Sequence, residues 1–388
     1  MRYVPSAMSW TRIGERLSRT LAVKEVDRAK LAESARVSVA DLTALEQGQP
    51  AKVSTAALAR LARELGLPPT ALWSEDPAAE IELSLHFRHA SVPDFFHEDA
   101  AVAERAVLDA RALDELDVLL GRQPLRTWFG PREVGAPAHE DGYARAREVR
   151  RVLAAKQVLS SEAAPIPIGF DVLVEDSLGI AVIEAKLRTG SVLALTAKDA
   201  PTNTVAIIVN SATGNTSHLR HRVDIAHELA HALFDAPAAP LSVWVDRDRD
   251  ADYGHQKTAV PEDAVEQRAR AFAAEFLVPR EGLRELLGPP PAEQASLKAA
   301  TEMVRSAQEH FLSSTELTAH HLANNSYIPK FLHEELLRAV SPLALPPVQR
   351  RQPALVRRAR EAVEAGVMTA MAAREVLGLS VWAKLPWS

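Results

Sequence analysis

Five consecutive residues, from His227 to His231, carry side chains that could bind a metal ion and activate water. They read His-Glu-Leu-Ala-His. Helical residues four apart lie on one face, so the imidazoles of His227 and His231 could both reach a single Zn²⁺. Glu228 would lie beside them and could take a proton from a metal-bound water without binding the metal itself. The arrangement is typical of zinc-dependent peptide hydrolysis, although the same letters can also occur by chance on an amphipathic helix.

The residues around this motif predict the two helices that such a site requires. Apolar residues recur three and four positions apart between Val223 and Phe234, which favours a helix over the motif. A catalytic zinc also needs a third protein ligand and an open position for water. Residues 262–279 show helical apolar spacing, end in proline and place Glu266 beside the apolar face. We therefore expect a second helix that packs against the first and offers Glu266 as the third ligand.

A wider pattern surrounds the two helices. A strand that ends in Asn210 precedes the H-E-L-x-H motif, and residues 266–279 read E-x-x-A-x-x-F-A-A-x-x-L-x-P. In these features the chain resembles the ImmA/IrrE metallopeptidase family, over roughly residues 145–330. The resemblance implies a zinc endopeptidase with Glu228 as its general base. It also implies that the zinc ligands are His227, His231 and Glu266.

The same resemblance implies a further His or Tyr that stabilises negative charge on the substrate carbonyl. The sequence does not choose among six candidates: His218, His221, Tyr253, His255, His320 and His321. The predicted strand at 205–209 could bind an extended substrate at a sheet edge through backbone hydrogen bonds. The alternative is that it is an ordinary buried strand.

The first 75 residues carry a separate pattern of short amphipathic helices. Apolar residues at helical spacing predict helices around 13–21, 31–35, 39–46 and 54–66. Residues 30–38, which read KLAESARVS, and 45–48, which read LEQG, resemble the second and third helices of the Xre (lambda-repressor-like) family. The resemblance implies a helix-turn-helix domain that places its third helix in the major groove of double-stranded DNA.

The composition of this segment only partly favours DNA binding. The third helix would present Ser38, Val39, Asp41, Leu42 and Thr43. None of these is an Arg, Asn or Gln, the side chains that read base edges best. Residues 1–75 hold eleven Lys and Arg and eight Asp and Glu, a net charge of +3, whereas the whole chain carries −6. The residues assigned to DNA contact are Arg36, Ser38, Val39, Thr43 and Lys52. The alternative is a helix-turn-helix that serves protein docking or dimerisation.

Composition excludes several other classes of protein. The 388-residue chain contains no cysteine, which excludes disulfides, thiol catalysis and cysteine zinc ligands. No apolar run reaches the roughly eighteen residues of a membrane span, and the first residues lack the apolar core of a signal peptide. We therefore expect a soluble, cytoplasmic protein with no membrane partner. P-loop and dinucleotide fingerprints are also missing.

These patterns predict an α+β fold that is mostly helical, in which a helix-turn-helix bundle precedes a zincin-like domain with a small sheet packed on metal-binding helices. The expected strands are 179–183, 192–196 and 205–209. The expected domains are a helix-turn-helix domain at 1–75, a helical connector at 76–142, a peptidase domain at 143–330 and a helical extension at 331–388. A long helix at 98–120 could be a dimer arm or packed core. Residues 354–377 should be helical, with a helix-turn segment from Gly366.

Two functions from different classes fit these predictions. In the first, the protein is a DNA-binding regulator with zinc-dependent endopeptidase activity that cleaves a specific protein, such as a transcriptional repressor in a stress or mobile-element response. In the second, it is a DNA-binding repressor or antitoxin-like regulator whose metal site is structural or proteolytically silent. Glu228 favours the first, because a structural zinc site usually has four protein ligands and needs no general base.

Overall fold

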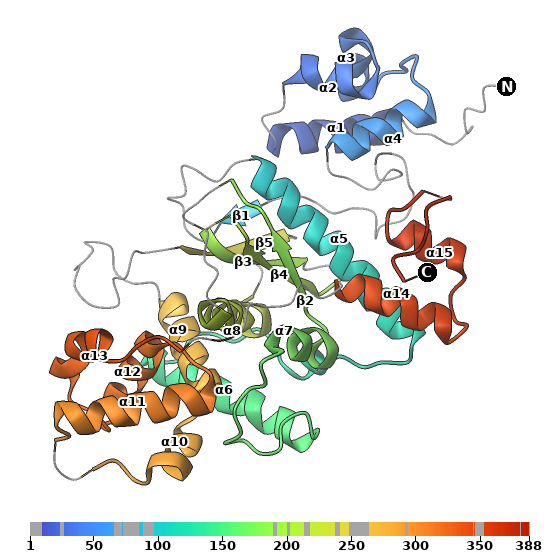
Figure 1. Cartoon of the computed structure of the whole chain (residues 1–388). Coiled ribbons are helices and arrows are strands. Elements are labelled where there is room, and N and C mark those ends of the chain that lie inside the picture. The colour runs from blue at the N-terminus through green and yellow to red at the C-terminus, as the bar shows by residue number, and fades with distance from the viewer. Residues whose placement is uncertain are drawn as a thin grey trace.

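The structure is a computed structural model that describes residues 10–23, 27–65, 72, 85–87, 97–188, 192–199, 202–212, 218–236, 241–247, 264–291, 294–343, 345, 353–380 and 382–387. Helices dominate, and one mixed sheet of five strands lies at the centre of the molecule (Figure 1). The fold is therefore α+β and mostly helical, as predicted, with two strands more than expected. No helix in the described part of the chain is both long and apolar enough to cross a membrane.

The strands of the sheet follow the order β1-β5-β3-β4-β2. Their bounds are β1 Leu85–Phe87, β2 Ala181–Ala185, β3 Val192–Asp199, β4 Thr204–Asn210 and β5 Leu241–Arg247. β3 runs antiparallel to both β4 and β5, whereas β2 is parallel to β4 and β1 is parallel to β5. β4 lies between two strands, and every residue of it is buried. The expectation that this strand forms a substrate-binding sheet edge is therefore wrong, and it is an ordinary buried strand.

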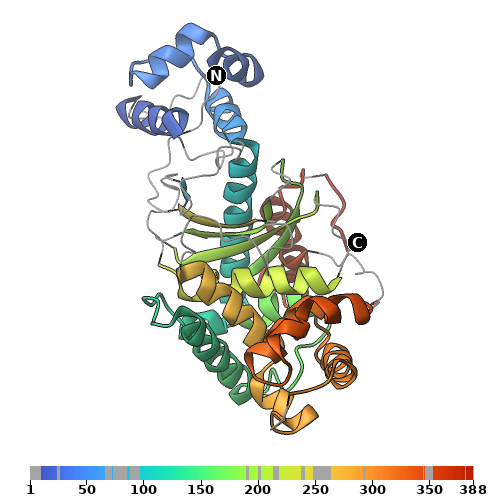
Figure 2. The same ribbon diagram turned by 90° about the vertical axis from the view of Figure 1, so that its left-hand side faces the viewer.

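Two long helices cover the two faces of the sheet. α5 (His97–Leu119) packs against β2, β3 and β4 on one face, while α8 (His218–Phe234) lies on the other (Figures 1 and 2). Side chains of β3 alternate between the two helices. Leu195 and Ala197 join the core beside α5, whereas Thr196 and Lys198 contact α8. α5 is thus part of the packed core.

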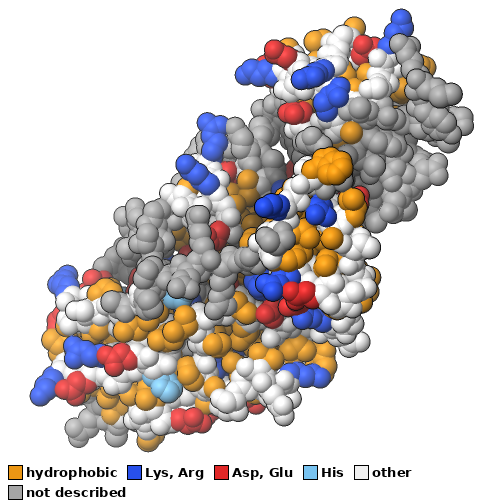
Figure 3. All heavy atoms as spheres, turned by 45° about the vertical axis from the view of Figure 1, so that its right-hand side comes forward, with side chains coloured by type: hydrophobic (Ala, Val, Ile, Leu, Met, Phe, Trp, Pro, Cys, Tyr) orange, Lys and Arg blue, Asp and Glu red, His pale blue; other side chains and the backbone are white. Residues whose placement is uncertain are grey.

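Four short helices form an N-terminal bundle. They are α1 Trp10–Val23, α2 Arg28–Ala35, α3 Val39–Glu46 and α4 Thr55–Glu64, close to the four that the sequence predicts. Asp27 caps the start of α2, Arg36 ends that helix in the left-handed conformation with φ 55°, and Ser38 caps α3. The bundle encloses its own core of leucine, isoleucine and alanine side chains. Figure 3 shows Lys and Arg side chains on its surface, mixed with acidic and apolar ones.

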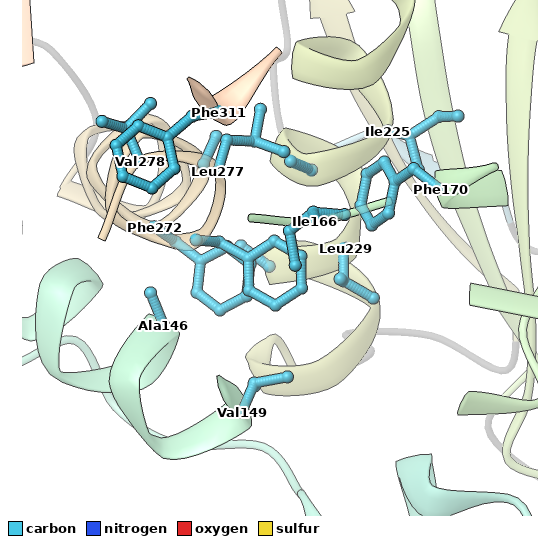
Figure 4. Packing of buried hydrophobic residues seen from close by; sticks show 14 of the residues in the cluster. Ala146, Val149, Ile166, Phe170, Ile225, Leu229, Phe272, Leu277, Val278 and Phe311 are labelled. Carbon is cyan, nitrogen blue, oxygen red and sulfur yellow. The ribbon is translucent and has the colours of Figure 1, made fainter. Parts of the chain in front are cut away.

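A layer of helices builds the largest hydrophobic core, and one of them, α9, packs directly against α8 (Figure 4). These helices are α6 Ala138–Ala155, α9 Ala264–Leu277, α10 Arg280–Leu287, α11 Leu297–Phe311, α12 Thr315–Asn324 and α13 His333–Ala339. The chain also forms four short helical turns: η2 Leu125–Trp128, α7 Phe170–Leu173, η3 Val174–Leu178 and η4 Lys330–Leu332. α6 approaches α9 closely at Gly142, where a Cβ atom would lie 2.8 Å from Ala271 Cβ and 2.9 Å from Phe272 N. α9 is therefore held between α6 and α8.

Two buried arginines fix the irregular segment between α6 and α7 by binding its carbonyl groups. Arg150 of α6 donates to the carbonyl of Glu162 at 2.6 Å and also to that of Ala164. Arg222 of α8 donates to the carbonyl of Ile166 at 2.9 Å. Burial lowers the pKa of each guanidinium to about 10, so both stay charged at neutral pH. The segment is thus fastened to α6 and to α8, which carries the HELAH motif.

The C-terminal helices α14 (Ala354–Glu364) and α15 (Ala370–Val376) pack against the end of α5. They are separated near Gly366, which has φ 72°, so the predicted helix-turn segment is confirmed. Arg358 of α14 is 2% exposed and binds Asp117 of α5 at 2.7 Å and Asp176 of η3 at 2.9 Å. These ion pairs fix α14 to two other parts of the fold.

The neighbouring pair between Arg357 of α14 and Glu175 of η3 should make this contact sensitive to pH. The two groups lie 2.9 Å apart. Burial raises the pKa of Glu175 from 4.5 to about 7, although the Arg357 guanidinium opposes the shift. The folded state therefore favours the protonated carboxyl. The contribution of Glu175 to the free energy of unfolding is therefore fully present below the ordinary pKa of the carboxyl. It is lost as the pH rises through the raised pKa, and the loss is about 3 kcal/mol at most.

We predict that Glu175→Gln removes this component of stability. Between about pH 5 and pH 8, the wild-type protein should lose stability relative to the variant, because only the wild type must ionise a buried carboxyl. Urea unfolding of both proteins at a series of pH values, followed by tryptophan fluorescence, measures the difference. Midpoints that run parallel over this range would show that Glu175 does not titrate as its burial requires.

Candidate metal centre

α8 and α9 bring three metal-binding side chains to one point. The Nε2 atoms of His227 and His231 lie 3.1 Å apart. Glu266 of α9 places Oε2 3.2 Å from Nε2 of His227 and Oε1 3.5 Å from Nε2 of His231. One donor atom from each residue lies within 4.8 Å of the others, and no second group of this kind occurs among the described residues. The three residues that the sequence nominates as ligands therefore meet, and together they could hold one metal ion.

A hydrogen bond behind the cluster fixes the orientation of His231. Its Nδ1 lies 2.5 Å from Oδ2 of Asp235, so Nδ1 carries the proton and the lone pair of Nε2 faces His227 and Glu266. Burial lowers the pKa of His231, but the Glu266 and Asp235 carboxylates outweigh it and hold this pKa above its usual value. Two imidazole nitrogens and one carboxylate make up the donor set of a hydrolytic zinc site. The residues present therefore fit zinc.

Asp235 is itself held by a buried arginine. Arg268 of α9 binds Oδ1 of Asp235 and donates to the carbonyl of Arg132 at 2.9 Å. Arg268 is 2% exposed and Asp235 is 3% exposed. The chain of contacts from His231 through Asp235 to Arg268 therefore ties α8 to α9 by protein groups alone. Neither partner was predicted from the sequence, although Asp235 follows His231 by one helical turn.

Glu228, the predicted general base, faces the sheet. Thr196 of β3 donates to the Glu228 carboxylate, and its Oγ1 lies 3.0 Å from the carbonyl oxygen of the same residue. Both residues are completely buried. Thr196 was not predicted as a site residue, and its only signal in the sequence is a hydroxyl among the apolar residues of a strand. The contact fixes the carboxylate of Glu228, which directly follows His227 in α8.

The cluster is closed to solvent in this structure. The exposed fractions are 4% for His227, 0% for Glu228, 1% for His231 and 6% for Glu266. Burial strengthens the electrostatic interactions among these groups, because the surrounding dielectric constant is low. It also means that these side chains present almost no surface to a peptide in this form.

Two of the residues considered for oxyanion stabilisation lie on α8 itself, away from the cluster. His218 and His221 come nine and six residues before His227 on the same helix. A rise of about 1.5 Å per residue places them about 14 Å and about 9 Å along the helix axis from His227. Burial lowers the pKa of both imidazoles, so they are neutral at neutral pH. Neither joins the metal cluster.

The other candidates do not join it either, as far as the structure describes them. His321 of α12 lies 3.3 Å from Glu275, a buried carboxylate further along α9. The ring of the adjacent His320 packs against a histidine of α13, with centroids 5.5 Å apart. Tyr253 and His255 lie outside the described residues.

The residues predicted to contact DNA lie on or beside α3. All five are exposed: Arg36, Ser38, Val39, Thr43 and Lys52. Asp41, whose negative charge repels phosphate, is engaged locally: its carboxylate accepts from the Ser38 hydroxyl at 2.6 Å and from the Lys52 backbone at 3.1 Å. The hydrogen bond from Ser38 holds the pKa of Asp41 below its usual value. Leu42 is completely buried, so the expectation that α3 presents it is wrong.

Comparison with known families gives a match for the central part of the chain. Residues 175–322 match the family model of the IrrE N-terminal-like domain. The family is one of peptidases. The match begins in η3, ends in α12 and includes the HELAH motif and Glu266, over a shorter stretch than the expected 145–330. A search of curated proteins found no match. The N-terminal helices lie outside the matched segment, so their resemblance to the Xre family stays a prediction.

We predict that Asp235→Asn weakens zinc binding by about 10-fold to 100-fold, because an amide cannot fix the tautomer of His231 as a carboxylate does. Titration of the metal-free protein with zinc measures the loss. Glu275→Gln is the matched control, since it breaks another buried carboxylate–histidine pair nine residues beyond Glu266 on α9. An equal loss of affinity in both variants would point to general destabilisation instead.

Proposed function

We propose that this protein is a zinc-dependent endopeptidase. The observation that carries the proposal is the buried cluster of two histidines and Glu266, with Glu228, also buried, next to His227 in α8. The match of this region to a peptidase family supports the proposal. The open fourth position that a three-ligand zinc site leaves is the one at which hydrolysis takes place.

The residues of the cluster divide the work of peptide hydrolysis. His227, His231 and Glu266 would hold Zn²⁺, which supplies Lewis acidity that lowers the pKa of water and polarises a peptide carbonyl. Glu228 takes the proton from the attacking water and delivers it to the leaving amine. The Thr196 hydroxyl keeps the Glu228 carboxylate in position for both transfers. The low dielectric constant around the cluster increases the benefit of each of these charges.

A regulator with a proteolytically silent metal site is the competing function. The burial of the cluster favours it, because Glu228 has no solvent-exposed surface in this form. The carboxylate of Glu228 favours the peptidase, since a silent structural site needs no general base. The two functions differ in whether Glu228 is needed for regulation, so this residue is the one to change.

We predict that the purified protein binds about one zinc ion per chain and that Glu266→Ala weakens that binding, because two histidines alone leave the site one ligand short. Elemental analysis of both proteins measures it. Glu228→Gln should retain zinc and lose peptide hydrolysis, which makes it the trap for isolating a substrate. A wild-type protein that stays empty after zinc is added, or cellular regulation that Glu228→Gln leaves unchanged, would contradict the proposed function.

We extend the proposal to the partners of the protein. The N-terminal bundle binds double-stranded DNA, and the substrate is a specific protein such as a transcriptional repressor, cleaved in a stress or mobile-element response. Arg36 and Lys52 are exposed, and the backbone of Lys52 donates to the carboxylate of Asp41 in α3. Val39 and Thr43 of α3 are exposed as well. The Asp41 carboxylate stays negatively charged while it accepts these hydrogen bonds, so the charges of Arg36 and Lys52 must outweigh its repulsion of phosphate.

We predict that Arg36→Ala and Lys52→Ala each weaken binding to a DNA duplex and reduce the slope of log Kd against log salt concentration by about one. Fluorescence anisotropy with a labelled duplex at several salt concentrations measures both effects. Arg360→Ala is the control, because this arginine is half exposed but lies on α14. Binding that neither N-terminal substitution changes would favour a bundle that docks to protein.

A further inference from the structure

β3 is the strand that touches the general base. Its Thr196 binds Glu228, and its Lys198 reaches the carbonyl of Ala232 on α8 at 3.5 Å. A peptide bond that is to be attacked beside Glu228 must therefore lie next to this strand. β3 has one neighbour, β4, on the side that leads to β2. Its other backbone edge is the place where an extended peptide could add as a further strand.

That edge is already covered by β5. Residues 241–247 pair with β3 in antiparallel register, with Trp244 opposite Thr196 and Ser242 opposite Lys198. β1 then pairs with the outer edge of β5, and β5 also contacts α8. Neighbouring strands lie about 4.8 Å apart. The backbone of β5 therefore fills the position beside Thr196, one strand away from the base.

We propose that β5 is an internal occupant of the substrate position and keeps the peptidase site closed. The inference rests on the proposed peptidase function and adds its regulation. The backbone hydrogen bonds between β5 and β3 are of the kind that an extended segment of a substrate protein would make in its place. Substrate enters when β5 leaves β3. The substrate class is therefore a polypeptide segment extended enough to pair with β3.

The position of β5 in the chain allows this movement without dismantling the metal cluster. β5 lies between the two ligand-bearing helices, after α8 ends at Phe234 and before α9 begins at Ala264. The contacts that align those helices come from elsewhere: His231 through Asp235 to Arg268, and the packing of α6 on α9. β3 also keeps its full pairing with β4 when β5 leaves. Opening therefore breaks one strand ladder and leaves the ligands in place.

A disulfide staple tests the proposal, because the chain contains no cysteine and an introduced pair can form only one bond. Ala197 of β3 lies opposite Val243 of β5, and opposite residues of antiparallel strands are at a distance that suits a disulfide. Ala197→Cys with Val243→Cys fixes β5 on β3. Ala197→Cys with Ala206→Cys is the matched control, since it joins β3 to β4 at a pair of opposite residues that the proposal leaves intact.

Two measurements follow the opening of the site. Transfer of bound zinc to the coloured chelator 4-(2-pyridylazo)resorcinol reports access to the cluster without any need for catalysis. Cleavage of unfolded, carboxymethylated casein reports the peptidase. The oxidised β3–β5 staple should slow both by about tenfold or more, because it prevents local opening, and reduction with a phosphine should restore them. The β3–β4 staple should slow neither.

A second variant tests release of the strand. Val243→Pro removes a backbone donor from β5 and should speed both zinc transfer and casein cleavage. Equal rates for the oxidised and reduced β3–β5 staple would overturn the inference, while the peptidase function stands if cleavage still requires Glu228. If no form of the protein cleaves casein, the rate of zinc transfer from the oxidised and the reduced β3–β5 staple decides whether β5 closes the site. A wild-type protein that binds no zinc, or cleavage that survives in Glu228→Gln, would overturn the proposed function itself.

Discussion

The packing of α9 on α8 is the contact on which the rest of the structure depends. The Glu266 carboxylate comes within 3.5 Å of both histidine nitrogens only because α9 lies on that face of α8. Phe234 of α8 and Phe272 of α9 secure the contact with rings 6.0 Å apart. α6 holds α9 from its other side, where Gly142 leaves no side chain in the way. A larger residue there would displace the helix that carries the third ligand, so a glycine on α6, which provides no ligand, helps to set the geometry of the cluster.

α8 is buried almost all round, yet it carries charged and titratable groups on several sides. An ionised group buried without partners costs several kcal/mol, so each group requires a partner from a different element. Glu266 lies beside the two histidines on the α9 side, Thr196 binds Glu228 on the sheet side, and Arg268 binds Asp235 at the end of the helix. The polar groups of α8 therefore determine where β3 and α9 must pack, as strongly as its apolar groups do.

The helices and the three candidate metal ligands were predictable because their signals are local. Spacing of three and four located α3, α8 and α9, and a four-residue interval placed two histidines on one face. The partner of Glu228 could not be found this way, since Thr196 is 32 residues distant and the contact depends on how β3 crosses α8. β5 was missed for a similar reason. Residues 241–247, LSVWVDR, are rich in strand-forming residues, but nothing local reveals that they pair with β3.

A buried catalytic cluster has two needs that conflict. Low solvent exposure strengthens the interactions among its charged groups, whereas a peptide substrate requires an open edge beside the base. The interval between the two ligand-bearing helices serves both needs in this chain. It lets the chain turn back, so that α9 can present Glu266 to the histidines, and within it β5 covers the edge of β3 next to Thr196. A shorter interval could still deliver the third ligand, but it would leave the edge of β3 bare. The length of chain between His231 and Glu266 therefore sets how the site is closed, separately from how it holds a metal.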